Sequence, residues 1–185
     1  VRFDRINPAP FFLDIGTCEN LVLNANGGND TFACSGNLAA LILITADGGP
    51  GDDTLLGSNG ADVLLGGDNN DFIDGQQGND VIFLGAGDDV CQWDPGDGND
   101  TLEGQAGSDR LKFNGSAIGE IFDASANGAR VRFTRNIGNI LMDLDDIEAL
   151  DLNALGGTDN LTVNNLSGTD LTSVNVDLAS PLGTT

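Results

Sequence analysis

Seven aspartates recur through the middle of the chain at a spacing close to nine residues. They are the sixth residues of seven nine-residue blocks: Asp53, Asp62, Asp71, Asp80, Asp89, Asp100 and Asp109. Carboxylate oxygens are the ligands that hard divalent cations prefer. Thiolates and imidazoles, which zinc and copper prefer, are scarce, because the chain has three cysteines and no histidine. The spacing therefore predicts oxygen-rich cation sites. Calcium is the ion that fits them, since magnesium demands a stricter octahedron and retains more water.

The same blocks are rich in glycine at their first, second and fourth positions. They run from Gly48 to Lys112, with Trp93 and Asp94 inserted before the sixth block, and only Asn69 replaces the fourth glycine. Glycine tolerates positive φ and lets backbone carbonyls crowd one point, so the first six residues predict a turn. The turn glycines expected to line the cation sites are Gly49, Gly51, Gly60, Gly67, Gly78, Gly85, Gly87, Gly98 and Gly107.

An apolar residue occupies the eighth position of every block and predicts a very short strand around it. Two turns and two strands then make one coil of two blocks. A three-residue strand cannot bury its face alone, so successive coils must stack in parallel. The sequence predicts an all-β fold, a right-handed parallel β-roll or β-helix solenoid. Stacking places Asp53, Asp71, Asp89 and Asp109 on one side, and Asp62, Asp80 and Asp100 on the other.

This pattern resembles the repeat-in-toxin family, also called hemolysin-type calcium-binding repeats, whose motif is Gly-Gly-x-Gly-x-Asp-x-apolar-x. The resemblance implies that the sixth-position aspartates and turn carbonyls bind Ca²⁺ between stacked turns, with roughly five ions. It also implies type I secretion and a calcium-binding structural or interaction module that folds outside the cell as it binds the ion. The insertion lengthens the interval from Asp89 to Asp109, so the sequence departs most from the family geometry there.

The flanks divide the chain into three expected regions. Val1–Arg5 matches Val131–Arg135 at an offset of about 130 residues, a repeat of whole units. We therefore expect residues 1–47 to be the β-helical tail of a preceding repeat unit, and the chain to be a piece of a longer protein. Residues 48–112 form the nonapeptide β-roll. Residues 113–185 form a hairpin and a β-helical tail that continues the same solenoid.

The last of these regions carries the strongest hairpin signal. Residues 120–125 and 129–134 alternate around Asn127-Gly128, a favoured turn pair. In the tail, apolar residues recur at a regular interval that we interpret as half a coil. This interval predicts coils of about 22 residues, which are wider than the coils of the roll. Looser Gly-x-Asp turns contain Asp30, Asp159 and Asp170. These aspartates are either further calcium ligands or Asx-turn residues, and the sequence leaves both readings open.

Composition excludes several classes of function. A net charge of −22 excludes nucleic acid and anionic membrane surfaces as partners. No apolar run is long enough for membrane insertion. Since 39% of the residues are hydrophobic, the acids accompany a core and do not signal disorder. Cys18, Cys34 and Cys91 are either small buried hydrophobes or, for the first two, a disulfide.

The sequence also allows two other functions, an enzyme and a surface-binding module. A polysaccharide-active β-helix enzyme would need acids or arginines from one of these sets: Asp143, Asp145, Asp146 and Glu148, or Arg130, Arg132 and Arg135. Without histidine or tyrosine, general acid–base chemistry has few actors, so we expect no enzyme. An adhesin-like module that binds a surface glycan or a protein is the main alternative. Trp93 is then either a contact point or a packing residue.

Overall fold

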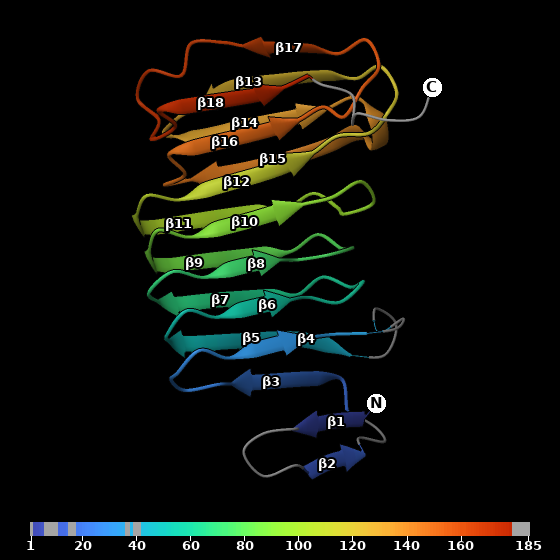
Figure 1. Cartoon of the computed structure of the whole chain (residues 1–185), viewed down its shortest axis with the longest axis vertical. Helices are drawn as coiled ribbons and strands as arrows, with labels where there is room; N and C mark the ends of the chain where they lie inside the picture. The colour runs from blue at the N-terminus through green and yellow to red at the C-terminus, as the bar shows by residue number, and fades with distance from the viewer. Residues whose placement is uncertain (1, 6–10, 15–17, 36–37, 39–41, 179–185) are drawn as a thin grey trace.

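The computed structural model describes residues 2–5, 11–14, 18–35, 38 and 42–178. Most of these residues belong to two largely parallel sheets that face each other in a solenoid (Figure 1). The seven-stranded sheet contains β4 (Thr31–Ala33), β6 (Thr54–Leu56), β8 (Phe72–Asp74), β10 (Val90–Trp93), β12 (Arg110–Asn114), β16 (Ala149–Asn153) and β18 (Ser173–Asp177). The nine-stranded sheet contains β3 (Asn20–Asn24), β5 (Leu43–Pro50), β7 (Val63–Asp68), β9 (Val81–Gly87), β11 (Thr101–Gly107), β13 (Ile121–Asn127), β14 (Arg130–Arg135), β15 (Ile140–Asp145) and β17 (Asn160–Val163). Together with one 3₁₀ turn at Ile137–Asn139, these elements confirm the predicted all-β solenoid.

The coil length follows the repeat. Thr54 of β6 pairs with Phe72 of β8, and Val63 of β7 pairs with Val81 of β9, so each coil takes two blocks. Strands β6 and β8 have three residues, as predicted. Strands β7, β9 and β11 are longer, because parallel pairing continues from the apolar residues into the glycine turns.

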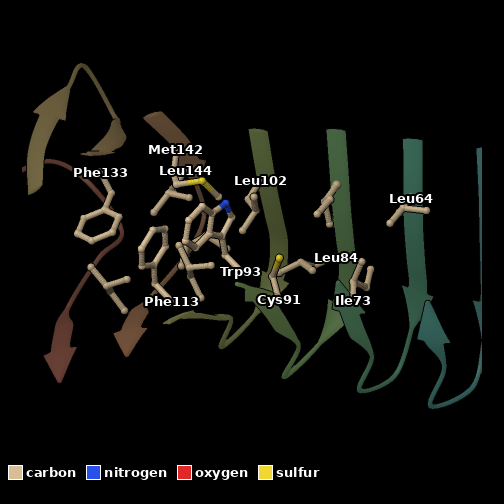
Figure 2. Packing of buried hydrophobic residues seen from close by; sticks show 14 of the residues in the cluster. Leu64, Ile73, Leu84, Cys91, Trp93, Leu102, Phe113, Phe133, Met142 and Leu144 are labelled. Carbon is tan, nitrogen blue, oxygen red and sulfur yellow. The ribbon is translucent and has the colours of Figure 1, made fainter. Parts of the chain in front are cut away.

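The core is a double column of apolar side chains between the two sheets (Figure 2). The eighth residue of every block points inward and is at most 1% exposed, which confirms the prediction for these positions: Leu55, Leu64, Ile73, Ile82, Cys91, Leu102 and Leu111. Side chains in this column touch their neighbours in the coils above and below. Each short strand therefore buries its face only when the next coil is in place.

The inserted Trp93 packs in the core and does not reach solvent. Its ring stacks on Phe113 at a centroid distance of 4.0 Å, and its indole N–H donates to the Gly98 carbonyl at 3.0 Å. Trp93 is 1% exposed. The coil thus accommodates the insertion by placing a large residue inside, so of the two readings of Trp93, packing is correct.

The predicted hairpin is present and lies within the nine-stranded sheet. Strands β13 and β14 pair antiparallel, with Asn127 opposite Arg130. From β12 the chain passes to β13, returns through β14, and reaches β15, which pairs parallel with β11. Strand β16 then pairs with β12. The hairpin therefore separates the last repeat from the next full coil in sequence but not in space.

The flanking coils are wider than those of the roll. In them β3 pairs with β5, and β16 pairs with β18. Each residue of β16 lies opposite the residue of β18 that is 24 positions later in the chain. Strands β1 (Arg2–Arg5) and β2 (Phe11–Asp14) pair antiparallel with each other. All three cysteines are free thiols, so the Cys18–Cys34 bridge is not formed. No helix among the described residues is long and apolar enough to cross a membrane.

Glycine substitution tests the close stacking of the turns. A side chain at Gly98 would overlap the carbonyl oxygen of Gly78 in the coil before it, whereas one at Gly27 would meet only ordinary contacts. Neither glycine has a positive φ. We expect Gly98→Ala to lower the free energy of unfolding by about 1–3 kcal/mol or more, as overpacking does. Gly27→Ala should change it by less than about 0.5 kcal/mol. Thermal unfolding in one calcium-containing buffer measures both, and equal stabilities would contradict the stacking.

Candidate metal centre

One side of the roll carries a ladder of aspartates from successive coils, which we call the first ladder. Its repeat members are Asp53, Asp71, Asp89 and Asp109. The backbone N–H of each donates to Oδ1 of the next, at 2.7, 2.7 and 3.0 Å. The predicted grouping of these four residues is confirmed. The longer interval from Asp89 to Asp109 leaves the hydrogen bond intact.

The opposite side carries the second ladder, formed by Asp62, Asp80 and Asp100. The N–H of Asp62 donates to Asp80 Oδ1 at 2.8 Å, and the N–H of Asp80 donates to Asp100 Oδ1 at 2.9 Å. All seven predicted aspartates are at most 4% exposed. The structure therefore buries two rows of carboxylates, each tied to the backbone of the preceding coil.

The second carboxylate oxygen of most ladder residues has no hydrogen-bond partner although it is buried. This holds for Oδ2 of Asp30, Asp53, Asp71, Asp80, Asp89 and Asp109. Asp62 differs, because its Oδ2 accepts from the Ser58 N–H at 2.5 Å. Buried carboxylate oxygens without a partner are costly, and they need a donor or a cation.

In several turns the first residue is a glycine that lies directly against Oδ2, so no side chain separates this oxygen from the next coil. A Cβ on Gly66 would lie 2.5 Å from Asp71 Oδ2 and would also meet the Leu84 carbonyl oxygen of the next coil. The corresponding atoms, Asp53 Oδ2 and Gly66 O, lie close to the Cβ position of Gly48. At these glycines a carboxylate oxygen and a carbonyl oxygen from adjacent coils thus approach one point, and such oxygens are the donor set that calcium prefers.

The predicted second- and fourth-position glycines stack on one another. Carbonyl oxygens of Gly49, Gly67, Gly60, Gly78 and Gly87 point at Gly67, Gly85, Gly78, Gly98 and Gly107 of the following coils, and Gly28 O points at Gly51. Sequence reasoning missed the first-position carbonyls that face Oδ2, such as Leu84 O, because it selected glycines only. The two-block period from Gly66 to Leu84 is the signal that could have found it.

Burial raises the pKa of every repeat aspartate above the usual carboxyl range. Desolvation raises the pKa of Asp71 to about 7, of Asp80 to about 8 and of Asp109 to about 7, and neighbouring acids add to it. Desolvation also raises the pKa of Asp100 to about 6. The pKa values of Asp53, Asp62 and Asp89 are raised by the same cause. In the absence of a cation, Asp71, Asp80 and Asp109 therefore retain protons near neutral pH.

Within the described ranges, no lysine or arginine forms an ion pair with any of the seven repeat aspartates. An equivalent position above the hairpin is different. Glu120 donates its N–H to Asp159 Oδ1 at 2.9 Å, as in the ladders, but its carboxylate pairs with the buried Arg135. Ser116 N–H and Oγ complete the hydrogen bonds of that carboxylate, at 2.8 and 2.9 Å. Arginine thus supplies a fixed positive charge here.

The looser turns have different outcomes. The N–H of Asp30 donates to Asp53 Oδ1 at 2.6 Å, so this turn joins the first ladder at its N-terminal end. Asp159 lies beside Glu120. Asp170 lies with Asp145 and Asp146, whose carboxylate oxygens are all within 4.8 Å of one another.

The structure brings together three of the residues considered for catalysis, Arg130, Asp143 and Asp145, and Asp146 lies beside Asp145. Arg130 pairs with Asp143 and Asp145, at 2.8 and 3.1 Å, on the outer face of the sheet. Arg132 is exposed, while Arg135 is buried against Trp93, with its guanidinium carbon 5.4 Å from the ring centroid. Glu148 stands in the first ladder, where its carboxylate accepts from the Asp109 N–H at 2.6 Å.

Comparison with known proteins identifies the repeats. The family model of the RTX calcium-binding nonapeptide repeat (4 copies) matches residues 47–82, 56–91 and 95–114. No curated protein and no solved structure matches the chain. The matched residues contain all seven repeat aspartates and the glycine turns between their coils. Residues 47–91 and 95–114 thus carry RTX calcium-binding nonapeptide repeats, and their place in a β-solenoid supports a calcium-binding structural repeat module.

Proposed function

We propose that this chain is a module of a secreted protein, and that it folds outside the cell when calcium ions bind between its stacked turns. The observation that carries the proposal is the set of buried Oδ2 atoms without hydrogen-bond partners, which recur along the first ladder and include Asp80 of the second. Glycine contacts this oxygen in the turns of Asp53, Asp71, Asp80 and Asp109, so no side chain covers it there. A cation bound between the turns would satisfy the orphaned oxygens.

The ligands would come from adjacent coils. The sixth-position aspartates would supply carboxylate oxygens across the intervals 53/71, 71/89, 89/109, 62/80 and 80/100. The first-position carbonyls, such as Leu84 O, and the stacked glycine carbonyls of the second and fourth positions would complete an oxygen shell. This arrangement holds roughly five ions at the six to eight oxygen ligands each that calcium takes.

Folding would be coupled to binding because the ladders exist only in the stacked state. Without an ion, a stacked coil must bury carboxylates either as unpaired charges or as protonated acids, and both are unfavourable near neutral pH. In an unfolded chain the same aspartates are hydrated. The free energy of calcium binding is then available for folding. Extracellular modules typically bind calcium at about 10⁻⁴ to 10⁻³ M, far above cytosolic levels. Such an affinity keeps the chain unfolded inside the cell and supports passage through a type I system.

Calcium titration tests the coupling directly. We expect chelator-treated protein to lose β signal in circular dichroism, and Ca²⁺ to restore it cooperatively near 10⁻⁴ to 10⁻³ M. Mg²⁺ at the same concentrations should not restore it, because a flexible shell of six to eight oxygens suits the larger ion. A complete β spectrum in chelator would overturn calcium-gated folding.

Adjacent aspartates of one turn provide a matched pair of variants. Asp89 is buried with an orphaned Oδ2, whereas Asp88 is exposed and accepts from the Ser108 N–H at 3.1 Å. Both changes to asparagine remove one charge. We expect Asp89→Asn to bind fewer ions and to raise the calcium midpoint for folding by about tenfold or more, while Asp88→Asn shifts it less than about twofold. Isothermal titration calorimetry measures the number of bound ions, and circular dichroism measures the calcium midpoint for folding. A larger effect of Asp88→Asn would mean that surface charge, not the ladder, controls binding.

The raised pKa values fix the sign of the pH dependence. With no calcium present, the folded state binds more protons than the unfolded state between the ordinary aspartate pKa, about 4, and the folded values of about 7 to 8 for Asp71 and Asp80. Stability must then fall as pH rises through this window. We expect the β signal of metal-free protein, which is lost near neutral and alkaline pH, to be larger at pH 5.5 than at pH 8.5 and to persist to a higher temperature there.

Calcium should reverse the preference, because bound ions hold the ladders ionised and protons compete with them. The calcium midpoint should therefore be higher at pH 5.5 than at pH 8.5. Melting curves in buffer freed of metal on a chelating resin, with and without added Ca²⁺, provide the check. Metal-free stability that rises with pH would show that the aspartates are not held protonated.

A further inference from the structure

The first ladder does not end with the nonapeptide repeats. Above Asp109 lies the turn Asp145–Glu148, which joins β15 to β16. Its Glu148 accepts a hydrogen bond from the Asp109 N–H at 2.6 Å. This is the bond that Asp71 accepts from Asp53 at 2.7 Å within the repeats. Glu148 therefore occupies the place of a sixth-position aspartate, although the hairpin separates it from Asp109 by 39 residues.

The same turn supplies a backbone oxygen in the expected place. A Cβ on Gly104 would lie 2.8 Å from Asp109 Oδ2 and would overlap the carbonyl oxygen of Asp146. Within the repeats, Gly66 has the same two neighbours, Asp71 Oδ2 and Leu84 O. Asp109 is 1% exposed, and its Oδ2 has no hydrogen-bond partner. A buried, unpartnered oxygen thus lies, with a carbonyl oxygen from a turn outside the repeats, against the same glycine.

The turn that carries Glu148 is shorter than a repeat turn but lies directly on the ladder. Asp145 pairs with Glu103, and Ala149 pairs with Arg110. Between these paired positions the repeat has the six residues 104–109, whereas the turn has only the three residues 146–148. The backbone N–H of Glu148 donates to the Asp109 carbonyl oxygen at 3.1 Å, so Glu148 is joined to Asp109 through both its backbone and its side chain.

No basic residue neutralises this place. Within the described part of the chain, neither Asp109 nor Glu148 has an ion pair. The neighbouring Arg110 pairs with Asp151, and Arg130 pairs with Glu103, Asp143 and Asp145. Glu120, by contrast, has the buried Arg135. Negative charge is compensated internally beside the hairpin but not between Asp109 and Glu148.

We propose that Asp109, Glu148 and the Asp146 carbonyl form a calcium site between the last nonapeptide repeat and the coil that follows the hairpin. The proposal rests on the proposed function, since it extends the same ladder. An ion here would fasten the last repeat to the coil that follows the hairpin. The parts of the solenoid on either side of the insertion would then be joined by the ion that stabilises the repeats.

Ion counting with matched variants tests this site. Glu148→Gln keeps an oxygen acceptor for the Asp109 N–H but removes the charge. Asp170→Asn removes a charge from the exposed member of the group Asp145, Asp146 and Asp170, and leaves the ladder carboxylates untouched. Native mass spectrometry at saturating Ca²⁺, with circular dichroism to verify folding, should show one ion fewer for Glu148→Gln. Asp170→Asn should retain the full number.

The outcomes separate the two proposals. Absence of bound calcium in the unaltered protein would remove the proposed function itself. Several ions in the unaltered protein and the same number in Glu148→Gln would overturn only the added site. Loss of an ion from Asp170→Asn alone would place it in the group of Asp145, Asp146 and Asp170 and also overturn the proposal.

A crystal of the unaltered protein grown with calcium gives a readout that does not depend on how the variants fold. We expect an anomalous difference peak between Asp109 Oδ2 and the Asp146 carbonyl oxygen. Peaks between the repeat turns without one at this place would contradict the proposal.

Discussion

Burial of aspartate between stacked coils is the constraint on which this solenoid depends. Six of the seven repeat aspartates, all but Asp62, use Oδ1 to accept a backbone hydrogen bond from the preceding coil, so they cannot turn to solvent without breaking a contact between coils. Oδ2 is then left buried and unpartnered in Asp53, Asp71, Asp80, Asp89 and Asp109. The groups that hold adjacent coils in register thus bring the charge that opposes stacking. Coil stability and cation binding are for this reason two aspects of one interaction.

The chain compensates buried charge in two ways along its length. In the described repeats, carboxylate and carbonyl oxygens of adjacent coils lie close to the same glycines, and no basic side chain pairs with the repeat aspartates. Beside the hairpin, Arg135 pairs with Glu120 and packs over Trp93. A guanidinium is a permanent part of the fold, whereas a calcium ion depends on its concentration outside the protein. The hairpin region therefore has a charge balance that does not vary with the medium, while that of the repeats does.

Apolar packing also differs between the repeat coils and the hairpin end of the solenoid. Between the repeat coils, each strand contributes one inward aliphatic side chain, such as Leu64 or Ile82. Near the hairpin, the core contains Phe113, Phe122 and Phe133 in edge and stacked contacts with ring centroids 5.0 to 6.1 Å apart. Aromatic side chains bury more area per residue. Packing thus stabilises the hairpin end more strongly, and the repeats depend more on their ladders.

Features that recur at a fixed interval along the chain could be predicted from the sequence alone. Because the coil equals two blocks, the spacing of Asp53 and Asp71 specified the ladders, and the eighth residues specified the core. The turn signal at Asn127-Gly128 specified the hairpin, since both strands are local. Contacts between residues joined by loops of unequal length could be identified only from the three-dimensional structure. Examples are the hydrogen bond between Asp109 and Glu148 and the ion pair between Arg135 and Glu120. No period relates these residues. Their meeting depends on how the hairpin enters the sheet and on how short the following turn is, and packing fixes both.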